Sequence, residues 1–155
     1  MFDTPLDALP AWLGVAAASL AALGVAVSLP VAPPPDADAA AATIDAVAAS
    51  EADAVSTHRT RARSVRIARE GIALRSDRGT VRAGFAFGPV TPVREETPLY
   101  RVLLGAAPAT EFESPDAFAR AVAAARDRAP VAAETDRLHA RNVHWEGVDV
   151  TLVGP

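Results

Sequence analysis

The chain has 155 residues, enough for one small domain beside an additional segment. It contains no cysteine, which excludes disulfide bonds, thiolate metal sites and cysteine nucleophiles. The net charge of −4 arises from 19 acidic and 15 basic residues, and every basic residue is an arginine. Eight of these arginines fall within residues 59–82 beside only two acids, so the positive charge is concentrated in one stretch of the chain.

Residues 11–29 contain no charged side chain and lie between Pro10 and Pro30. A helix of this length, rising about 1.5 Å per residue, matches the roughly 30 Å hydrocarbon core of a bilayer. We therefore predict an N-terminal tail at 1–9 and a transmembrane helix at 10–29. The alternatives are a buried helix of a soluble domain and a cleaved secretory signal. The acidic tail and the lack of a small-x-small cleavage site favour an uncleaved anchor.

The predicted transmembrane helix carries small side chains along one face. Gly14, Ala18, Ala21 and Val25 follow helical spacing, and such faces let two helices approach closely. We treat these four residues as candidate helix-packing positions. Basic residues near the ends of the segment would indicate its orientation, but there are none. A short tail stays inside easily, so we expect a single-pass protein of the cell membrane with an extracytoplasmic C-terminal domain.

A proline-rich segment and an alanine-rich segment follow the predicted anchor. The sequence Pro-Val-Ala-Pro-Pro-Pro at 30–35 favours a stiff, extended conformation. Asp36 is a suitable N-cap for a helix over about 37–55, whose apolar stripe is thin. We therefore predict a stalk with a lightly packed helix at 30–58 and a domain at 59–155.

From residue 64 the pattern changes from helical to alternating. Residues 64–69, 72–75 and 80–87 each read as a half-buried strand. Glu70-Gly71 and Asp77-Arg78-Gly79 between them are typical turn sequences. Three strands on such short turns predict an antiparallel meander.

The remaining chain predicts a mixture of helices and strands. Ser114-Pro115-Asp116 is a strong helix start, because a capping serine precedes a proline and an acid in the first turn. The fold class we expect is α+β: an N-terminal transmembrane helix, a Pro-rich stalk, and a small domain with an antiparallel β-meander and one or two packed helices. The further elements expected are a helix at 98–104, a strand at 110–113, a helix at 115–127, and strands at 138–145 and 148–153.

No arrangement of side chains in the sequence indicates catalysis. His139 and His144 are five positions apart, which places them on opposite faces of a strand, and His58 is expected in a solvated linker. Glu111 and Glu113 lie on a face expected to be exposed. The chain has no nucleophile elbow, phosphate-binding loop or dinucleotide fingerprint. We therefore predict no enzymatic activity, no cofactor, no metal site and no small-molecule substrate.

The arginine-rich stretch is the feature that implies a partner. On alternating strands, Arg66, Arg75 and Arg82 share the solvent-facing side. Such a face suits nucleic acid, anionic lipid headgroups or an acidic protein surface. Aromatic residues are not interleaved with these arginines, so we do not expect a nucleic-acid partner. The alternative is a solvated face with no partner.

Four segments resemble a family of small haloarchaeal single-span membrane proteins of unassigned function: residues 1–9, 29–36, 85–93 and 143–153. The resemblance covers essentially the whole chain and implies an archaeal, halophilic membrane protein associated with type IV pilus or secretion machinery. The acidic residues before the apolar segment and the prolines at 30–35 depart from the pattern of a processed pilin.

The function we expect is therefore that of a membrane-anchored, non-enzymatic accessory or assembly protein of an archaeal surface appendage or secretion apparatus. Its expected partners are the membrane and other membrane or appendage proteins. The alternative is an anchored binding module that recognises an anionic partner through the Arg59–Arg82 face.

Overall fold

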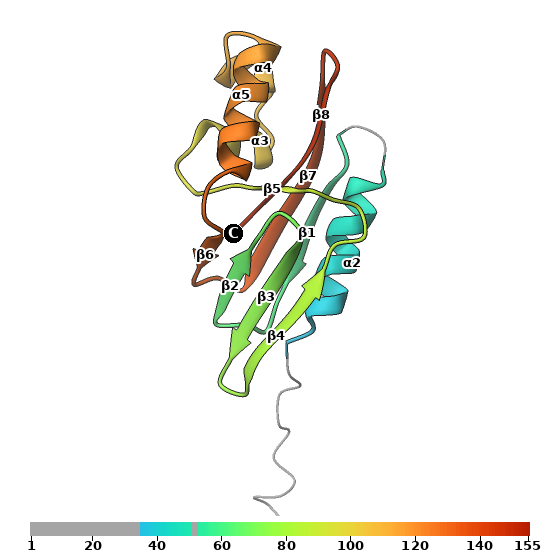
Figure 1. Cartoon of the computed structure of the whole chain (residues 1–155), viewed down its shortest axis with the longest axis vertical. Coiled ribbons are helices and arrows are strands. Elements are labelled where there is room, and N and C mark those ends of the chain that lie inside the picture. Colours follow the sequence, from blue (N-terminus) through green and yellow to red (C-terminus); the bar gives the residue numbers. More distant parts are fainter. Residues whose placement is uncertain (1–34, 51–52) are drawn as a thin grey trace, which may run out of the picture. The chain divides into compact units, whose positions relative to one another are not determined.

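The computed structural model of the chain describes residues 35–50 and 53–155. This part contains four helices and two four-stranded sheets (Figure 1). The predicted transmembrane helix at 10–29, with its candidate packing residues, lies outside the described residues. Among the helices described, none is long and apolar enough to cross a bilayer. The elements are α2 (Ala37–Ala48), β1 (Val55–Arg59), β2 (Ser64–Ile67), β3 (Gly71–Ser76), β4 (Gly79–Gly84), β5 (Thr91–Pro92), α3 (Pro98–Leu103), α4 (Pro108–Glu111), α5 (Pro115–Arg126), β6 (Val131–Ala133), β7 (Arg137–Trp145) and β8 (Val148–Gly154).

The first sheet has the strand order β1-β7-β8-β5. Its centre is the long hairpin of β7 and β8, which confirms the strands expected at 138–145 and 148–153. Glu146 and Gly147 connect them with φ values of 45° and 87°. Two successive residues of positive φ match the right-handed twist of a hairpin. β1 pairs antiparallel with β7, and the short β5 pairs parallel with β8.

The second sheet has the strand order β4-β3-β2-β6 and is antiparallel throughout. Strands β2, β3 and β4 form the predicted meander, with Gly79 at φ 124° in the second turn. β6 joins the sheet beside β2 although it follows much later in the chain. Its sequence, Val-Ala-Ala, is too short and too weakly patterned to have been recognised as a strand.

One hydrophobic core lies between α2 and strands of both sheets. Ala40 and Ile44 of α2 are almost fully buried with Ile67, Leu74 and Leu138 in the same cluster. Alanine side chains are small, so the helix can approach the sheets closely. A thin apolar stripe is therefore enough to pack α2 into the core. Residues of α2 from Ala37 onward therefore belong to a hydrophobic core, although the helix precedes residue 59, where we expected the domain to begin.

Polar contacts also secure α2 within the domain. The Asp36 side chain accepts a hydrogen bond from the backbone N–H of Ala39 at 2.9 Å, as expected for an N-cap. The helix ends at Ala48, earlier than the expected residue 55. His58, expected in a solvated linker, instead lies in β1 and is partly buried, with its Nδ1 3.2 Å from the Thr43 hydroxyl of α2.

A second core lies on the other face of the β7–β8 hairpin, against α3 and α5 (Figure 1). Phe118 of α5 is fully buried there, and its ring packs edge-on against Phe112 with centroids 5.3 Å apart. α5 confirms the helix expected at 115–127, with the Ser114 hydroxyl accepting from the N–H of Ala117. The strand expected at 110–113 is wrong, because Pro108 begins the short helix α4 there.

Candidate functional site

Strand register brings the three predicted arginines onto one face of the second sheet. Ala73 of β3 pairs with Arg66 on one side and with Arg82 on the other. Arg75, two residues from Ala73 on the same strand, pairs with Ser64 and Thr80. Directly opposed residues and residues two apart share a face. We call Arg66, Arg75 and Arg82, with the small residues between them, the basic sheet face.

The floor of the basic sheet face is made of small side chains. Ala73 separates Arg66 from Arg82, and Ala132 of β6 lies opposite Arg66 on its other side. Since neighbouring strands are about 4.8 Å apart, Arg66 and Arg82 start about 10 Å from each other. Two shallow hollows lie between the arginines, with volumes of about 390 and 520 Å³. The long arginine side chains thus border two hollows that the side chains of a partner could enter.

The opposite side of the same strands explains why the arginines point outward. Val65, Ile67, Ile72 and Leu74 alternate with them and are buried against α2. A shift of one residue in register would bury the guanidinium groups, which is prohibitively unfavourable. The hydrophobic core therefore holds the arginines at the surface.

The three arginines carry uncompensated charge. Within residues 35–50 and 53–155, none of them forms an ion pair, whereas Arg63 nearby pairs with Asp77 at 2.8 Å. One acid, Glu70 in the β2–β3 turn, borders the smaller hollow. The basic sheet face is thus a fixed cluster of cations, free to pair with external carboxylates or phosphates.

The structure does not place the whole arginine-rich stretch on one surface. Arg59 lies in β1 of the first sheet, and Arg61 lies in the connection that follows. Arg63 lies just before β2 and forms an ion pair with Asp77. The predicted Arg59–Arg82 face is therefore narrower than the sequence indicated.

A second group of arginines adjoins the basic sheet face and was missed by the sequence analysis. Arg69 and Arg128 border a hollow of about 280 Å³ that shares Ala68 and Glu70 with the smaller hollow of the sheet face. Arg128 also borders a groove together with Arg94. These residues come from three separate loops, so no local pattern could have joined them.

Arg126 lies near Arg69 of this second group and has a structural role. Its Nε donates to the Thr91 hydroxyl at 2.9 Å, and its Nη2 donates to the Pro89 carbonyl at 3.2 Å. Burial lowers the pKa of Arg126, and the nearby positive charge of Arg69 lowers it further. Arg126 therefore anchors the segment before β5 to the end of α5.

The candidate catalytic side chains lie apart from one another. The Nδ1 atom of His139 is 3.2 Å from the Thr57 hydroxyl. His144 lies on the other face of β7 and pairs across the hairpin with Asp149. A hydrogen bond from Arg101 holds the pKa of Glu111 below its ordinary value, so this carboxylate is charged near neutral pH. In the described part of the chain, no three His, Asp or Glu side chains come together as metal ligands would.

The fold and the basic sheet face define a small α+β domain with two antiparallel-rich sheets and one exposed cationic sheet surface. The chain belongs to DUF7283, a family of unknown function, whose sequence model matches residues 3–143. No curated protein and no solved structure shows a significant match to the chain.

Proposed function

We propose that this domain is a binding module that docks an acidic protein surface on the basic sheet face. The observation that carries the proposal is the register that sets Arg66 and Arg82 on either side of Ala73, with Arg75 next along the strand. Arginine binds carboxylates through two parallel hydrogen bonds, so three fixed guanidinium groups select a partner with matching acids.

The shape of the face favours a protein over the other anionic partners. Its floor carries alanine, serine and threonine and offers no aromatic ring on which a base could stack, as single-stranded nucleic acid would require. The two hollows between the arginines suit protruding carboxylate side chains. A flat lipid surface would leave these hollows unfilled.

The finer assignment is part of the same proposal: a single-pass archaeal membrane protein that serves as an accessory or assembly component of a surface appendage or secretion apparatus. It is supported by the uncharged segment at 11–29 and by the resemblance to haloarchaeal membrane proteins. An exposed docking domain on an anchor suits assembly at a membrane. Protease accessibility of residues 36–155 in intact cells tests the compartment, and co-purification with appendage or secretion components tests the partner.

The docking proposal is tested with the full chain in nanodiscs of zwitterionic phosphatidylcholine. Poly-glutamate is titrated against the wild type and against the triple variant Arg66→Glu, Arg75→Glu, Arg82→Glu. Exposed ion pairs contribute up to about 1 kcal/mol each, so we expect the variant to bind at least about tenfold more weakly. We also expect wild-type binding to weaken as salt is raised.

The matched control is the triple variant Arg59→Glu, Arg61→Glu, Arg78→Glu. It changes net charge equally at three exposed arginines outside the basic sheet face. Equal weakening by both triple variants would contradict the proposal, because net charge alone would then explain binding. Tighter binding of poly-uridylate, or of vesicles containing anionic lipid, would contradict the choice of an acidic protein.

A further inference from the structure

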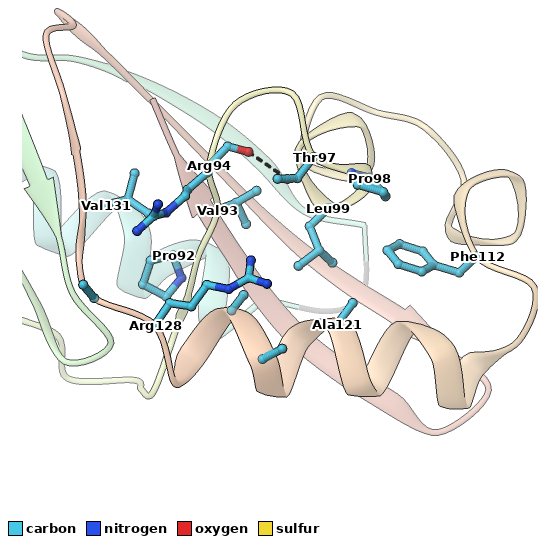
Figure 2. A pocket seen from close by; sticks show the side chains of 13 residues that line it. Pro92, Val93, Arg94, Thr97, Pro98, Leu99, Phe112, Ala121, Arg128 and Val131 are labelled. Atoms are coloured by element: carbon cyan, nitrogen blue, oxygen red, sulfur yellow. Dashed lines mark hydrogen bonds between the residues drawn. The ribbon is translucent and has the colours of Figure 1, made fainter.

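A groove separate from the basic sheet face runs along α5. One wall is the helix itself, and the facing wall is formed by α3 and the segment between β5 and α3 (Figure 2). Its volume is about 300 Å³, at the lower end of the range for small-molecule sites. The apolar part of its lining includes Val93, Leu99, Phe112, Ala121, Ala124 and Ala125.

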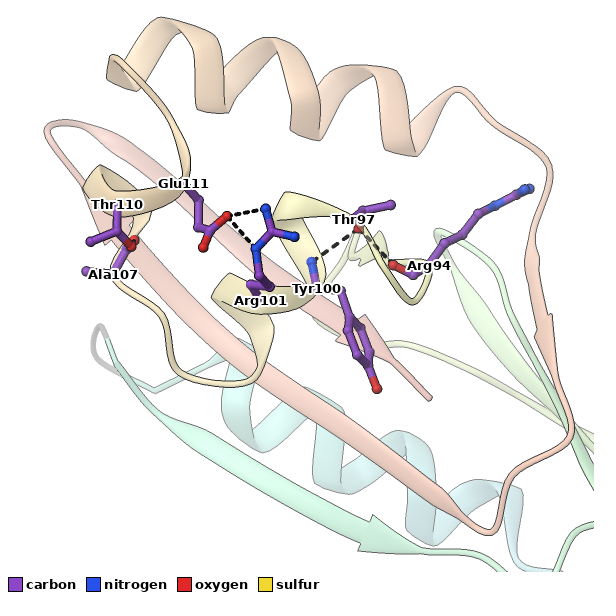
Figure 3. Close-up of polar contacts among 7 residues, drawn as sticks. All are labelled: Arg94, Thr97, Tyr100, Arg101, Ala107, Thr110 and Glu111. Carbon is purple, nitrogen blue, oxygen red and sulfur yellow. Dashed lines mark hydrogen bonds and ion pairs between the residues drawn. The ribbon is translucent and has the colours of Figure 1, made fainter.

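The walls of this groove are held by contacts that need no ligand (Figure 3). The Thr97 hydroxyl donates to the Arg94 carbonyl at 2.7 Å and accepts from the N–H of Tyr100, which fixes the start of α3. Arg101 of α3 donates through Nε to Glu111 of α4 at 2.6 Å, which ties the two short helices together. The groove is therefore preformed, and a ligand would meet little ordering cost there.

The groove is polarised along its length. Arg94 and Arg128 lie at one end, and Phe112 lies at the other (Figure 2). Arg128 extends from beyond the end of α5 across the groove toward Leu99 (Figure 2). No acidic residue lines the groove, and neither arginine forms an ion pair with any residue of the described part. Positive charge at one end of an apolar groove is complementary to an anionic amphiphile.

There is also room for a head group beyond the groove itself. Arg128 and Pro92 border both the groove and the neighbouring hollow of about 280 Å³. Arg69 and Glu70 also border that hollow. A head group at Arg128 could therefore also approach Arg69. The Glu70 carboxylate would disfavour a second negative charge within that hollow.

We propose that the groove binds a single-chain anionic amphiphile. Its carboxylate or phosphate head pairs with Arg94 and Arg128, and its apolar chain lies along Ala121, Ala124 and Ala125 toward Phe112. Burial of the chain supplies the non-directional part of the affinity, and the two guanidinium groups select the charge and the direction of the ligand. The groove shares no lining residue with the two hollows of the docking surface proposed on the second sheet.

The test uses the full chain in phosphatidylcholine nanodiscs with a photoreactive decyl phosphate that carries a diazirine at the end of its chain. Labelled peptides are mapped by mass spectrometry. We expect labels near Leu99, Phe112 and Ala121, at least fivefold above those from the same chain with a trimethylammonium head. Excess unlabelled decanoate should compete, and inorganic phosphate at the same concentration should not.

Two pairs of variants make the test specific. Ala124→Leu narrows the groove and should lower labelling at least fivefold, whereas Ala123→Leu, exposed on the same helix outside the lining, should leave it unchanged. Arg94→Glu with Arg128→Glu should have the same effect as Ala124→Leu. Its control is Arg78→Glu with Arg120→Glu, an equal charge change at exposed sites away from the groove.

Several results would overturn this inference. Equal labelling by the phosphate and trimethylammonium probes would show a merely apolar surface. Competition by inorganic phosphate would show a simple anion site. Labels confined to residues 11–29 would show partitioning into the bilayer alone. The basic-face triple variant should keep its groove labelling, so failure of this site and failure of the docking proposal are distinguishable.

Discussion

The guanidinium of Arg141 donates a hydrogen bond from Nη1 to the carbonyl oxygen of Val102 at 2.6 Å, which links the centre of β7 to the last turn of α3. The same nitrogen donates to the Ala106 carbonyl at 3.1 Å, and Nη2 reaches the Asp53 carboxylate at 3.3 Å. The Arg141 side chain is only 11% exposed. Arg141 thus donates hydrogen bonds to carbonyl groups at the C-terminal end of α3. Its positive charge also interacts favourably with the negative end of the helix dipole.

Replacing Arg141 should destabilise the domain strongly. In Arg141→Met, the carbonyls of Val102 and Ala106 lose a charged donor, and the Asp53 carboxylate loses its partner. We expect the free energy of unfolding to fall by about 3 kcal/mol, measured by urea denaturation. Arg120→Met, at an exposed site on α5, should change it by less than about 0.5 kcal/mol. Similar losses in both variants would contradict the proposed role of Arg141.

Phe118 should dominate the stability of the second core. Its ring is fully buried, packs against Phe112, and lies 5.9 Å from the ring of Trp145. We expect Phe118→Ala to lower the free energy of unfolding by about 3–5 kcal/mol and to alter the fluorescence of Trp145. Phe87→Ala is the control, because Phe87 is 56% exposed and should contribute little. An equal effect of the two substitutions would be inconsistent with this packing.

The paired glycines Gly71 and Gly84 should respond differently to alanine. A Cβ at Gly71 would lie 2.6 Å from the Ala83 carbonyl oxygen of the neighbouring strand, whereas one at Gly84 would lie 3.6 Å from its nearest neighbour. Gly71→Ala therefore forces β3 and β4 apart and should cost about 1–3 kcal/mol in urea denaturation. Gly84→Ala should be tolerated. A reversed order would mean that this pairing of β3 and β4 is incorrect.

His139 should make the stability of the domain depend on pH. Burial, and secondarily the charge of Arg137, lower its pKa below the ordinary 6.5. Between the two pKa values the unfolded chain binds more protons than the folded chain, so stability increases with pH in that window. The contribution is complete above about pH 6.5 and decreases as the pH falls toward the folded pKa.

The pH prediction is measured as the urea midpoint from pH 7.5 down to pH 5. His139→Gln should flatten the dependence just below pH 6.5. An unchanged slope in His139→Gln would assign the pH dependence to other groups.

Local sequence patterns predicted much of this fold because their causes are local. Ser114 and Pro115 start α5 through contacts within one helical turn, and Gly147 readily adopts the positive φ of the tight turn between β7 and β8. Arg66, Arg75 and Arg82 were assigned to one face by the two-residue period of strands, and the register brings them together. Local patterns failed to predict the structure of Thr110–Glu113, because the helix that Pro108 starts there has no apolar repeat in its sequence.

The sequence by itself therefore determined the meander, the hairpin, the helix over Pro115–Arg126 and the outward position of three arginines, because each depends on neighbours a few residues away. Only the tertiary structure decided that the alanine-rich helix α2 belongs to the core, that β6 joins β2, and that Arg94 and Arg128 line one groove. Each of these features depends on a segment far away in the sequence, which supplies a surface for small side chains, an open strand edge or a second charge.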